Sequence, residues 1–167
     1  MPTRDPSDPQ VHPAGAGPDY DKTGEMVRNA TKAVGAVFLL VGILGFIPGI
    51  TTNYDAMEFA GHDSGAELVG LFQVSVLHNI VHLLFGVAGL AMAKTVKSAT
   101  TYLIAGGVIY LVLAVYGAVV GQHSDGNFVP LNGADDLLHL VLGLGMLGLG
   151  LMGLRARPGS IGAGRPA

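Results

Sequence analysis

The fold is decided by the stretch DDLLHLVLGLGMLGLGLMGLRAR, residues 135–157. Its segment GLGMLG, residues 143–148, matches the G-x-G-x-x-G pattern with which soluble enzymes bind a dinucleotide. That pattern requires a strand before the glycines and a helix with polar flanks after them. Here the glycines lie inside one apolar run, from Leu137 to Leu154, which two arginines close. The stretch therefore predicts a membrane-spanning helix and not a nucleotide site.

The composition of the whole chain supports a membrane protein. The 167 residues are enough for one domain. Half of them (50%) are hydrophobic and only 13% are charged, whereas soluble domains have about 25% charged residues. The mean hydropathy is +0.50. Cysteine is absent from the sequence, which excludes disulfides, thiolate metal sites and cysteine nucleophiles.

Four apolar segments predict four transmembrane helices. They are residues 30–49, 68–93, 99–120 and 135–154. Each is long enough for a hydrocarbon core that needs about 20 helical residues, and a helix satisfies its own backbone hydrogen bonds in lipid. We therefore expect an all-α, integral membrane four-helix bundle over residues 30–155. The Pro-, Gly- and Asp-rich residues 1–29 are expected to form a disordered tail, and residues 156–167 a second, short tail.

The basic residues predict the orientation of these helices. Arg4, Lys22, Arg28 and Lys32 precede or open the first segment, Lys94 and Lys97 separate the second from the third, and Arg155, Arg157 and Arg165 follow the fourth. No basic residue lies in the other two connections. The positive-inside rule then places both termini and the turn between the second and third segments in the cytoplasm, which predicts a multi-pass membrane protein.

The two outer connections are acidic. They contain Asp55, Glu58, Asp63, Glu67, Asp125, Asp135 and Asp136. Such a surface is often only a solvated loop. The outer loop 50–67 is nevertheless long enough to contact other membrane-protein subunits. The helix faces offer a second such surface. We expect lipid around the helices and no binding to nucleic acid.

Polar and small residues form stripes along the predicted helices, which advance about 100° per residue. On the second helix one face holds Ser75, His78, Asn79, His82, Gly86, Gly89 and Ala93. On the fourth helix one stripe holds Asp136, His139, Gly143, Gly150 and Gly153, with Gly145 and Gly148 on another side. Polar groups are costly in hydrocarbon and turn inward, and small residues let helix backbones approach one another.

These stripes predict two sets of interior residues. The predicted interior polar cluster is Ser75, His78, Asn79, His82, Asp136 and His139. The predicted helix-packing residues are Gly86, Gly89, Gly143, Gly150 and Gly153, and the glycines of the fourth helix are expected to pack on two faces.

The second and fourth helices resemble each other. NIVHLLFG, residues 79–86, and DLLHLVLG, residues 136–143, share the pattern [ND]-x-x-H-x-x-x-G. Both helices run in the same direction across the membrane. The pattern predicts two tandem helical hairpins in which His82 and His139 play equivalent parts.

Three roles are open for the intramembrane histidines. They can form interhelical hydrogen bonds, which fix the faces that meet. Alternatively, His82 and His139 can be the axial ligands of a b-type haem, since a glycine one turn away from each leaves room for the macrocycle. A third possibility is a proton, ion or small-solute path, and a metal site at His78 and His82 is a variant of the last two. We expect no catalytic residue, because neither a nucleophile elbow nor an H-E-x-x-H pattern occurs. Apart from the haem alternative, no cofactor is predicted.

Two segments carry a resemblance to a known family. HNIVHLLFG, residues 78–86, and FVPLNGADDLLHLVLG, residues 128–143, resemble small four-helix membrane proteins of actinobacteria, the family called domain of unknown function 4383. The similarity covers about residues 30–155, and a looser one is to the DoxX-like membrane proteins. Its marks at the start of the fourth helix are Asn132, Asp135, Asp136 and His139. The resemblance implies the four-helix topology and an actinobacterial plasma membrane, but no activity. We therefore expect a small non-enzymatic membrane protein that serves as an accessory, assembly or scaffold component of a membrane complex.

Overall fold

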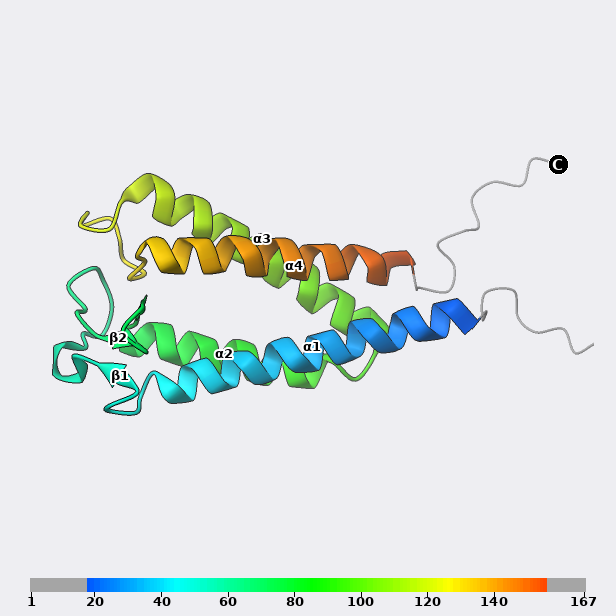
Figure 1. Ribbon diagram of the computed structural model, residues 1–167. Coiled ribbons are helices and arrows are strands. Elements are labelled where there is room, and N and C mark those ends of the chain that lie inside the picture. The colour runs from blue at the N-terminus through cyan, green and yellow to red at the C-terminus, as the bar shows by residue number, and fades with distance from the viewer. Residues whose placement is uncertain (1–17, 156–167) are drawn as a thin grey trace, which may run out of the picture.

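Four helices form two antiparallel hairpins, with a small β-sheet at one end (Figure 1). The structure, a computed structural model, describes residues 18–155. The helices are α1 (Pro18–Leu44), α2 (Val76–Met92), α3 (Val96–Val120) and α4 (Gly133–Arg155). α1 lies beside α2, and α3 lies beside α4 (Figure 1). The predicted all-α architecture of tandem hairpins is therefore confirmed.

Three helical segments are long and apolar enough to cross a membrane: Lys22–Leu44, Val96–Val120 and Gly133–Arg155. α2 is also apolar but has only 17 residues, which is about the lower limit for spanning the hydrocarbon core. The length and composition of these helices agree with the predicted membrane fold.

The second helix begins later than predicted. Residues 68–75, expected as its first two turns, belong instead to a three-stranded antiparallel sheet of β1 (Thr51–Thr52), β2 (Glu67–Leu68) and β3 (Phe72–Gln73) and to the turn after it. Val69 and Gly70 connect β2 to β3 with positive φ angles of 49° and 68°, a conformation that no helix contains. The Ser75 hydroxyl accepts the backbone N–H of His78 at 3.2 Å and caps α2.

The first helix is displaced from its predicted bounds in the other direction. It begins at Pro18, so residues 18–29 are helical and do not form part of a disordered tail, and it ends at Leu44 and not at residue 49. The extra turns are anchored: Val27 is fully buried, and Arg28 Nε donates to the carbonyl of Ala93 at 3.2 Å. The expected tails at residues 1–17 and 156–167 lie outside the described residues.

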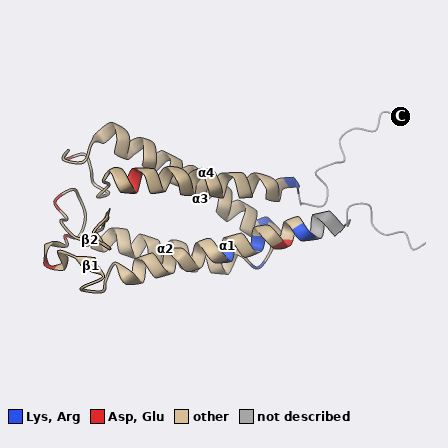
Figure 2. Cartoon of the chain, viewed as in Figure 1, with Lys and Arg blue, Asp and Glu red and all other residues tan. Residues whose placement is uncertain are grey.

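The charges separate along the bundle (Figure 2). Lysine and arginine gather at the terminal end, where α1 begins, α4 ends and α2 turns into α3. Most acidic residues lie at the opposite end, in or near the cap, which we define as residues 45–75. This separation is the pattern from which the orientation was predicted, and the orientation itself remains a prediction.

Candidate functional site: a histidine-lined cavity between the hairpins

The two hairpins pack by equivalent contacts. A Cβ atom added to Gly35 of α1 would lie 3.0 Å from the carbonyl oxygen of Gly86 on α2. A Cβ atom added to Gly107 of α3 would lie 2.9 Å from the carbonyl oxygen of Gly143 on α4. The shared helix pattern already aligns Gly86 with Gly143. The predicted repeat is thus present in the packing and extends to the first helix of each hairpin.

A sequence signal for this other half of the repeat exists but was missed. GAVFLLVGILG, residues 35–45, aligns with GVIYLVLAVYG, residues 107–117, when Gly35 is placed on Gly107. The connections between the helices differ in length: the first hairpin is joined by residues 45–75 and the second by the shorter loop 121–132. The extra residues of the first connection build the cap.

The predicted packing glycines all lie at helix contacts. Gly86, Gly89, Gly143, Gly150 and Gly153 meet Leu39, Gly35, Leu111, Ile104 and Thr100, respectively. In contrast, a Cβ atom on Gly145 or Gly148 would meet nothing within 4 Å. The expectation that α4 packs on two glycine faces is therefore wrong: one face packs against α3 and the other is open.

Two aromatic rings meet at the centre of the bundle. Phe38 of α1 and Tyr110 of α3 occupy equivalent positions, and their ring centroids lie 5.3 Å apart with an interplanar angle of 12°. Each ring also contacts the histidine of its own hairpin: Phe38 lies 5.4 Å from His82, and Tyr110 lies 5.0 Å from His139. The two histidines thus have equivalent positions, as the repeat predicts.

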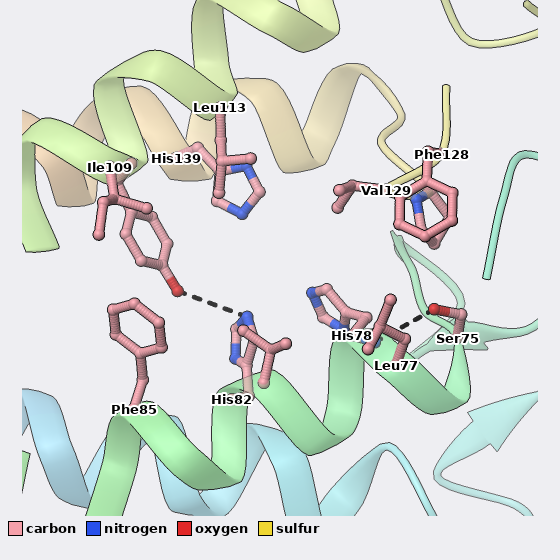
Figure 3. A pocket seen from close by; sticks show the side chains of 13 residues that line it. Ser75, Leu77, His78, His82, Phe85, Ile109, Leu113, Phe128, Val129 and His139 are labelled. Atoms are coloured by element: carbon pink, nitrogen blue, oxygen red, sulfur yellow. Dashed lines mark hydrogen bonds between the residues drawn. The ribbon is translucent and has the colours of Figure 1, made fainter. Parts of the chain in front are cut away.

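A cavity of about 230 Å³ lies between the hairpins, near the cap (Figure 3). It is lined by Ser75, Leu77, His78, Val81, His82, Phe85, Ile109, Tyr110, Leu113, Phe128, Val129, Pro130 and His139. α2 contributes two histidines, α3 contributes the tyrosine, and α4 contributes the third histidine from the opposite wall (Figure 3). The rest of the lining is apolar apart from Ser75.

The polar atoms around the cavity are only partly satisfied. Tyr110 Oη lies 3.4 Å from His82 Nε2, and His78 Nδ1 lies 3.5 Å from Asn79 Oδ1. The imidazole rings of His78 and His82 are 4.2 Å apart. Nδ1 of His82 and Nδ1 of His139 are buried and have no hydrogen-bond partner. Both atoms are enclosed by protein, so they are unpaired within the packing around the cavity and do not open into it.

Two members of the predicted polar cluster lie elsewhere. Asn79 is fully buried, but its side chain contacts Gly45, just after the end of α1, and does not line the cavity. Its equivalent, Asp136, contacts Gly117 of α3 in the same way and is only half-buried. Both side chains belong to the seams within the hairpins, so Asp136 does not join the histidines.

The acid with the larger structural role is Asp135, which the polar-cluster prediction omitted. Its Oδ2 accepts the backbone N–H groups of Asn132 and Gln73, each at 3.0 Å. Asn132 Oδ1 in turn accepts the N–H of Asp135 at 3.0 Å, which completes a reciprocal capping box. Asn132 Nδ2 also donates to the carbonyl of Leu71 at 2.9 Å. This clasp of Leu71, Gln73, Asn132 and Asp135 ties the cap to α4.

The clasp shows how the two halves of the repeat differ. Asn132 and Asp135 are the equivalents of Ser75 and His78 when His139 is aligned with His82. At the start of the second hairpin's α4, Asp135 faces β3 of the cap and accepts a hydrogen bond from Gln73. In the first hairpin, His78 faces the cavity (Figure 3). The side chain at this position of the repeat thus contacts the cap in the second hairpin (Asp135) and lines the cavity in the first (His78).

The described residues bear on the metal and haem alternatives. Among residues 22–155, no group of three or more His, Cys, Asp or Glu side chains is arranged to hold a metal ion. Tyr110 contacts both His82, through its hydroxyl, and His139, through its ring. A haem with these histidines as axial ligands would require the phenol to leave that position.

Comparisons with known proteins give a family but no activity. No curated protein and no solved structure matches the chain. One family model matches residues 28–152, which include all the residues that line the cavity and most of the four helices. The chain belongs to the family described as Domain of unknown function (DUF4383).

Proposed function

We propose that this small membrane protein is a non-enzymatic accessory component whose cavity binds a small, lipid-soluble molecule. The observation that supports this function is the convergence of three imidazoles and one phenol on a single apolar cavity. Binding sites for small molecules have this construction, with mostly apolar walls and a few polar groups that orient the ligand.

The lining favours an uncharged ligand with at least one oxygen atom. No lysine, arginine, aspartate or glutamate is among the residues that line the cavity. Burying a charged group without a counter-charge is far more costly than burying a hydrogen-bonded neutral group. A neutral imidazole has one N–H donor and one acceptor nitrogen, so a carbonyl or hydroxyl group would find a partner on either wall.

The lining also favours ligand binding over catalysis. The Ser75 hydroxyl accepts a backbone N–H at the start of α2 and so acts as a helix cap. The Tyr110 hydroxyl contacts His82 and holds α3 against α2. Both hydroxyl groups in the lining thus have structural partners.

Three bicyclic compounds of similar shape test this function. Naphthalene has no polar atom, 1-naphthol has a hydroxyl and naphthoquinone has carbonyls. In detergent, we expect naphthol and naphthoquinone to raise the thermal unfolding midpoint by mass action and naphthalene to raise it less. His139→Ala should remove the difference. His139→Gln keeps side-chain bulk and controls for a folding defect.

A matched control for this experiment is His123→Ala, because His123 lies in the 121–132 loop and outside the cavity lining. It should respond to the ligands as the wild type does. Equal stabilisation by all three compounds, or an unchanged response in His139→Ala, would overturn the proposed function.

The accessory role is also supported by the surface of the cap. Phe59 and Val69 are 63% and 62% exposed there, among acidic residues that include Glu58 and Asp63. We propose that this surface contacts a basic subunit of a membrane complex. Co-purification of such a subunit should be lost in Glu58→Lys and kept in Lys94→Glu, which changes a charge at the terminal end.

The haem alternative remains a proposal that one spectrum tests. A Soret band in the purified protein that disappears in the His82→Ala/His139→Ala double variant would establish a haem with these ligands. The carrier alternative is tested by uptake into proteoliposomes that contain a pH-sensitive dye.

A further inference from the structure

A second hollow adjoins the histidine-lined cavity. It has a volume of about 350 Å³ and lies between α2 and α3, with Met92, Tyr102 and Ala105 among its lining residues. Phe85 and Ile109 line both the hollow and the cavity. The two spaces are therefore neighbours, and a single molecule can occupy both by passing these two side chains.

The polarity of this combined site changes along α2. His78 and His82 lie at the cap side, and the lining from Phe85 to Met92 is apolar. From His82 to Met92 the helix rises about 15 Å. A ligand that matches this pattern has a compact polar group at one end and a hydrocarbon chain of similar length.

The hollow is open to the side of the bundle that faces lipid. Leu84, in its lining, is 63% exposed, and Ile109 at the boundary is 42% exposed. Such residues contact acyl chains if the helices span a bilayer as predicted. A tailed molecule dissolved in the membrane can then enter from the side without crossing the cap.

The walls of the cavity fit a flat ring. Phe85, Tyr110 and Phe128 present aromatic groups, and the imidazoles are also planar. Aromatic and imidazole rings pack well against another ring in stacked or edge-to-face geometry. No cation lies among the lining residues to pair with an acidic head group.

Resting on the proposed function, we propose that the cavity and the hollow together bind a lipid with a flat, uncharged, oxygen-bearing ring and one hydrocarbon tail. This is the chemistry of the lipid quinones. The ring oxygens accept N–H groups of the cavity histidines, and the tail lies between α2 and α3.

The test compares two quinones that differ only in the tail. One is a methylated benzoquinone without a tail, and the other has the same ring with a decyl chain. The chain has five tyrosines and no tryptophan, so quenching of tyrosine fluorescence by the quinone gives a binding curve. Affinities are expressed per mole fraction in the micelle, so that partitioning of the tail does not contribute.

The decisive variant is Ala105→Phe, which fills the hollow at an exposed position of α3. It should weaken binding of the decyl quinone by about tenfold, as overpacking of a site by one large side chain does, and leave the tailless quinone unaffected. Thr101→Phe, also in the lining and exposed, is the second variant. Ala36→Phe makes the same change on an exposed part of α1 outside both spaces and should alter neither affinity.

The outcomes separate this inference from the proposed function. If the tailless quinone fails to bind to the wild type, both are overturned. If it binds but Ala105→Phe and Thr101→Phe leave the decyl quinone unchanged, only the tail assignment is overturned. Displacement of the decyl quinone by decanoate at equal concentration would overturn the assignment of an uncharged head, whereas we expect no displacement.

Discussion

Phe38 and Tyr110 stack with their centroids 5.3 Å apart at equivalent positions of the two hairpins, and they differ by a single oxygen atom. That oxygen lies 3.4 Å from Nε2 of His82. Phe38, at the equivalent position of the first hairpin, has no oxygen to offer the equivalent histidine, His139. This one difference breaks the symmetry at the centre of the bundle, whereas Nδ1 is unpaired in both histidines.

Removal of this oxygen should have a small effect on stability. Tyr110→Phe deletes one long hydrogen bond, and such bonds are worth about 0.6 kcal/mol on average within a membrane protein. Tyr110→Ala, which also deletes the stacked ring, should cost about 3–5 kcal/mol. Unfolding in mixed micelles by a denaturing detergent measures both. A loss in Tyr110→Phe as large as that in Tyr110→Ala would mean that the hydroxyl, and not the ring, holds the hairpins together.

Replacing glycine by alanine should lower stability where α3 packs against α4 and should not lower it on the open face of α4. A Cβ atom on Gly107 would lie 2.7 Å from the backbone nitrogen of Leu147, so Gly107→Ala should cost about 1–3 kcal/mol by overpacking. Gly145→Ala meets nothing within 4 Å and should be neutral or should stabilise the helix by up to about 1 kcal/mol. The same unfolding measurement applies, and equal losses in the two variants would argue against the glycine seam.

Loss of the clasp should loosen the cap and leave the helices in place. Asp135→Ala removes the acceptor of the Asn132 and Gln73 N–H groups, which should cost about 1–3 kcal/mol. Hydrogen exchange should accelerate at these two amides. Asp125→Ala is the control, because Asp125 is exposed and its carboxylate lies 4.0 Å from His62, away from the clasp. Unchanged exchange in Asp135→Ala would show that the clasp does not hold the cap.

The orientation can be tested with single cysteines, because the chain has none of its own. The positive-inside rule predicts that the cap is outside the cell and the α2–α3 turn is inside. In intact cells, Asp63→Cys should therefore react with a membrane-impermeant maleimide. Lys94→Cys should react only after permeabilisation. The reverse pattern would invert the orientation while leaving the fold unchanged.

The sequence predicts the long helices well and their boundaries less well. Hydropathy locates α3 and α4 within a few residues because an apolar run of about 20 residues or more has few alternatives. It fails for residues 68–75, since a short apolar strand and turn has the same composition as a helix. The start of α1 has a signal in PDYD, residues 18–21, because proline and acidic residues are typical of a first helical turn. The low hydropathy of residues 18–29 conceals it.

The site could be predicted in part for similar reasons. The repeat of the [ND]-x-x-H-x-x-x-G pattern identifies His82 and His139 as equivalent, and the polar stripe contains His78. Tyr110 is not found in this way, because one aromatic residue in an apolar helix has no periodic signal. Asp135 and Asp136 are neighbours that point about 100° apart around α4. The sequence pattern does not fix the rotation of the helix well enough to tell which of the two faces the cap. The cavity itself depends on how the two hairpins meet.

The account rests on lipid surrounding the helices while the histidines face one another, and a spin-label scan of α4 tests this most directly. Single-cysteine variants at residues 137–148, labelled in liposomes, report collision rates with dissolved oxygen, which partitions into lipid, and with a water-soluble nickel chelate. Oxygen collisions should be frequent at Leu137, Val141 and Leu144, which are exposed, and rare at His139 and Met146, which are buried. Frequent oxygen collisions at His139, or frequent nickel collisions along the whole helix, would contradict the account.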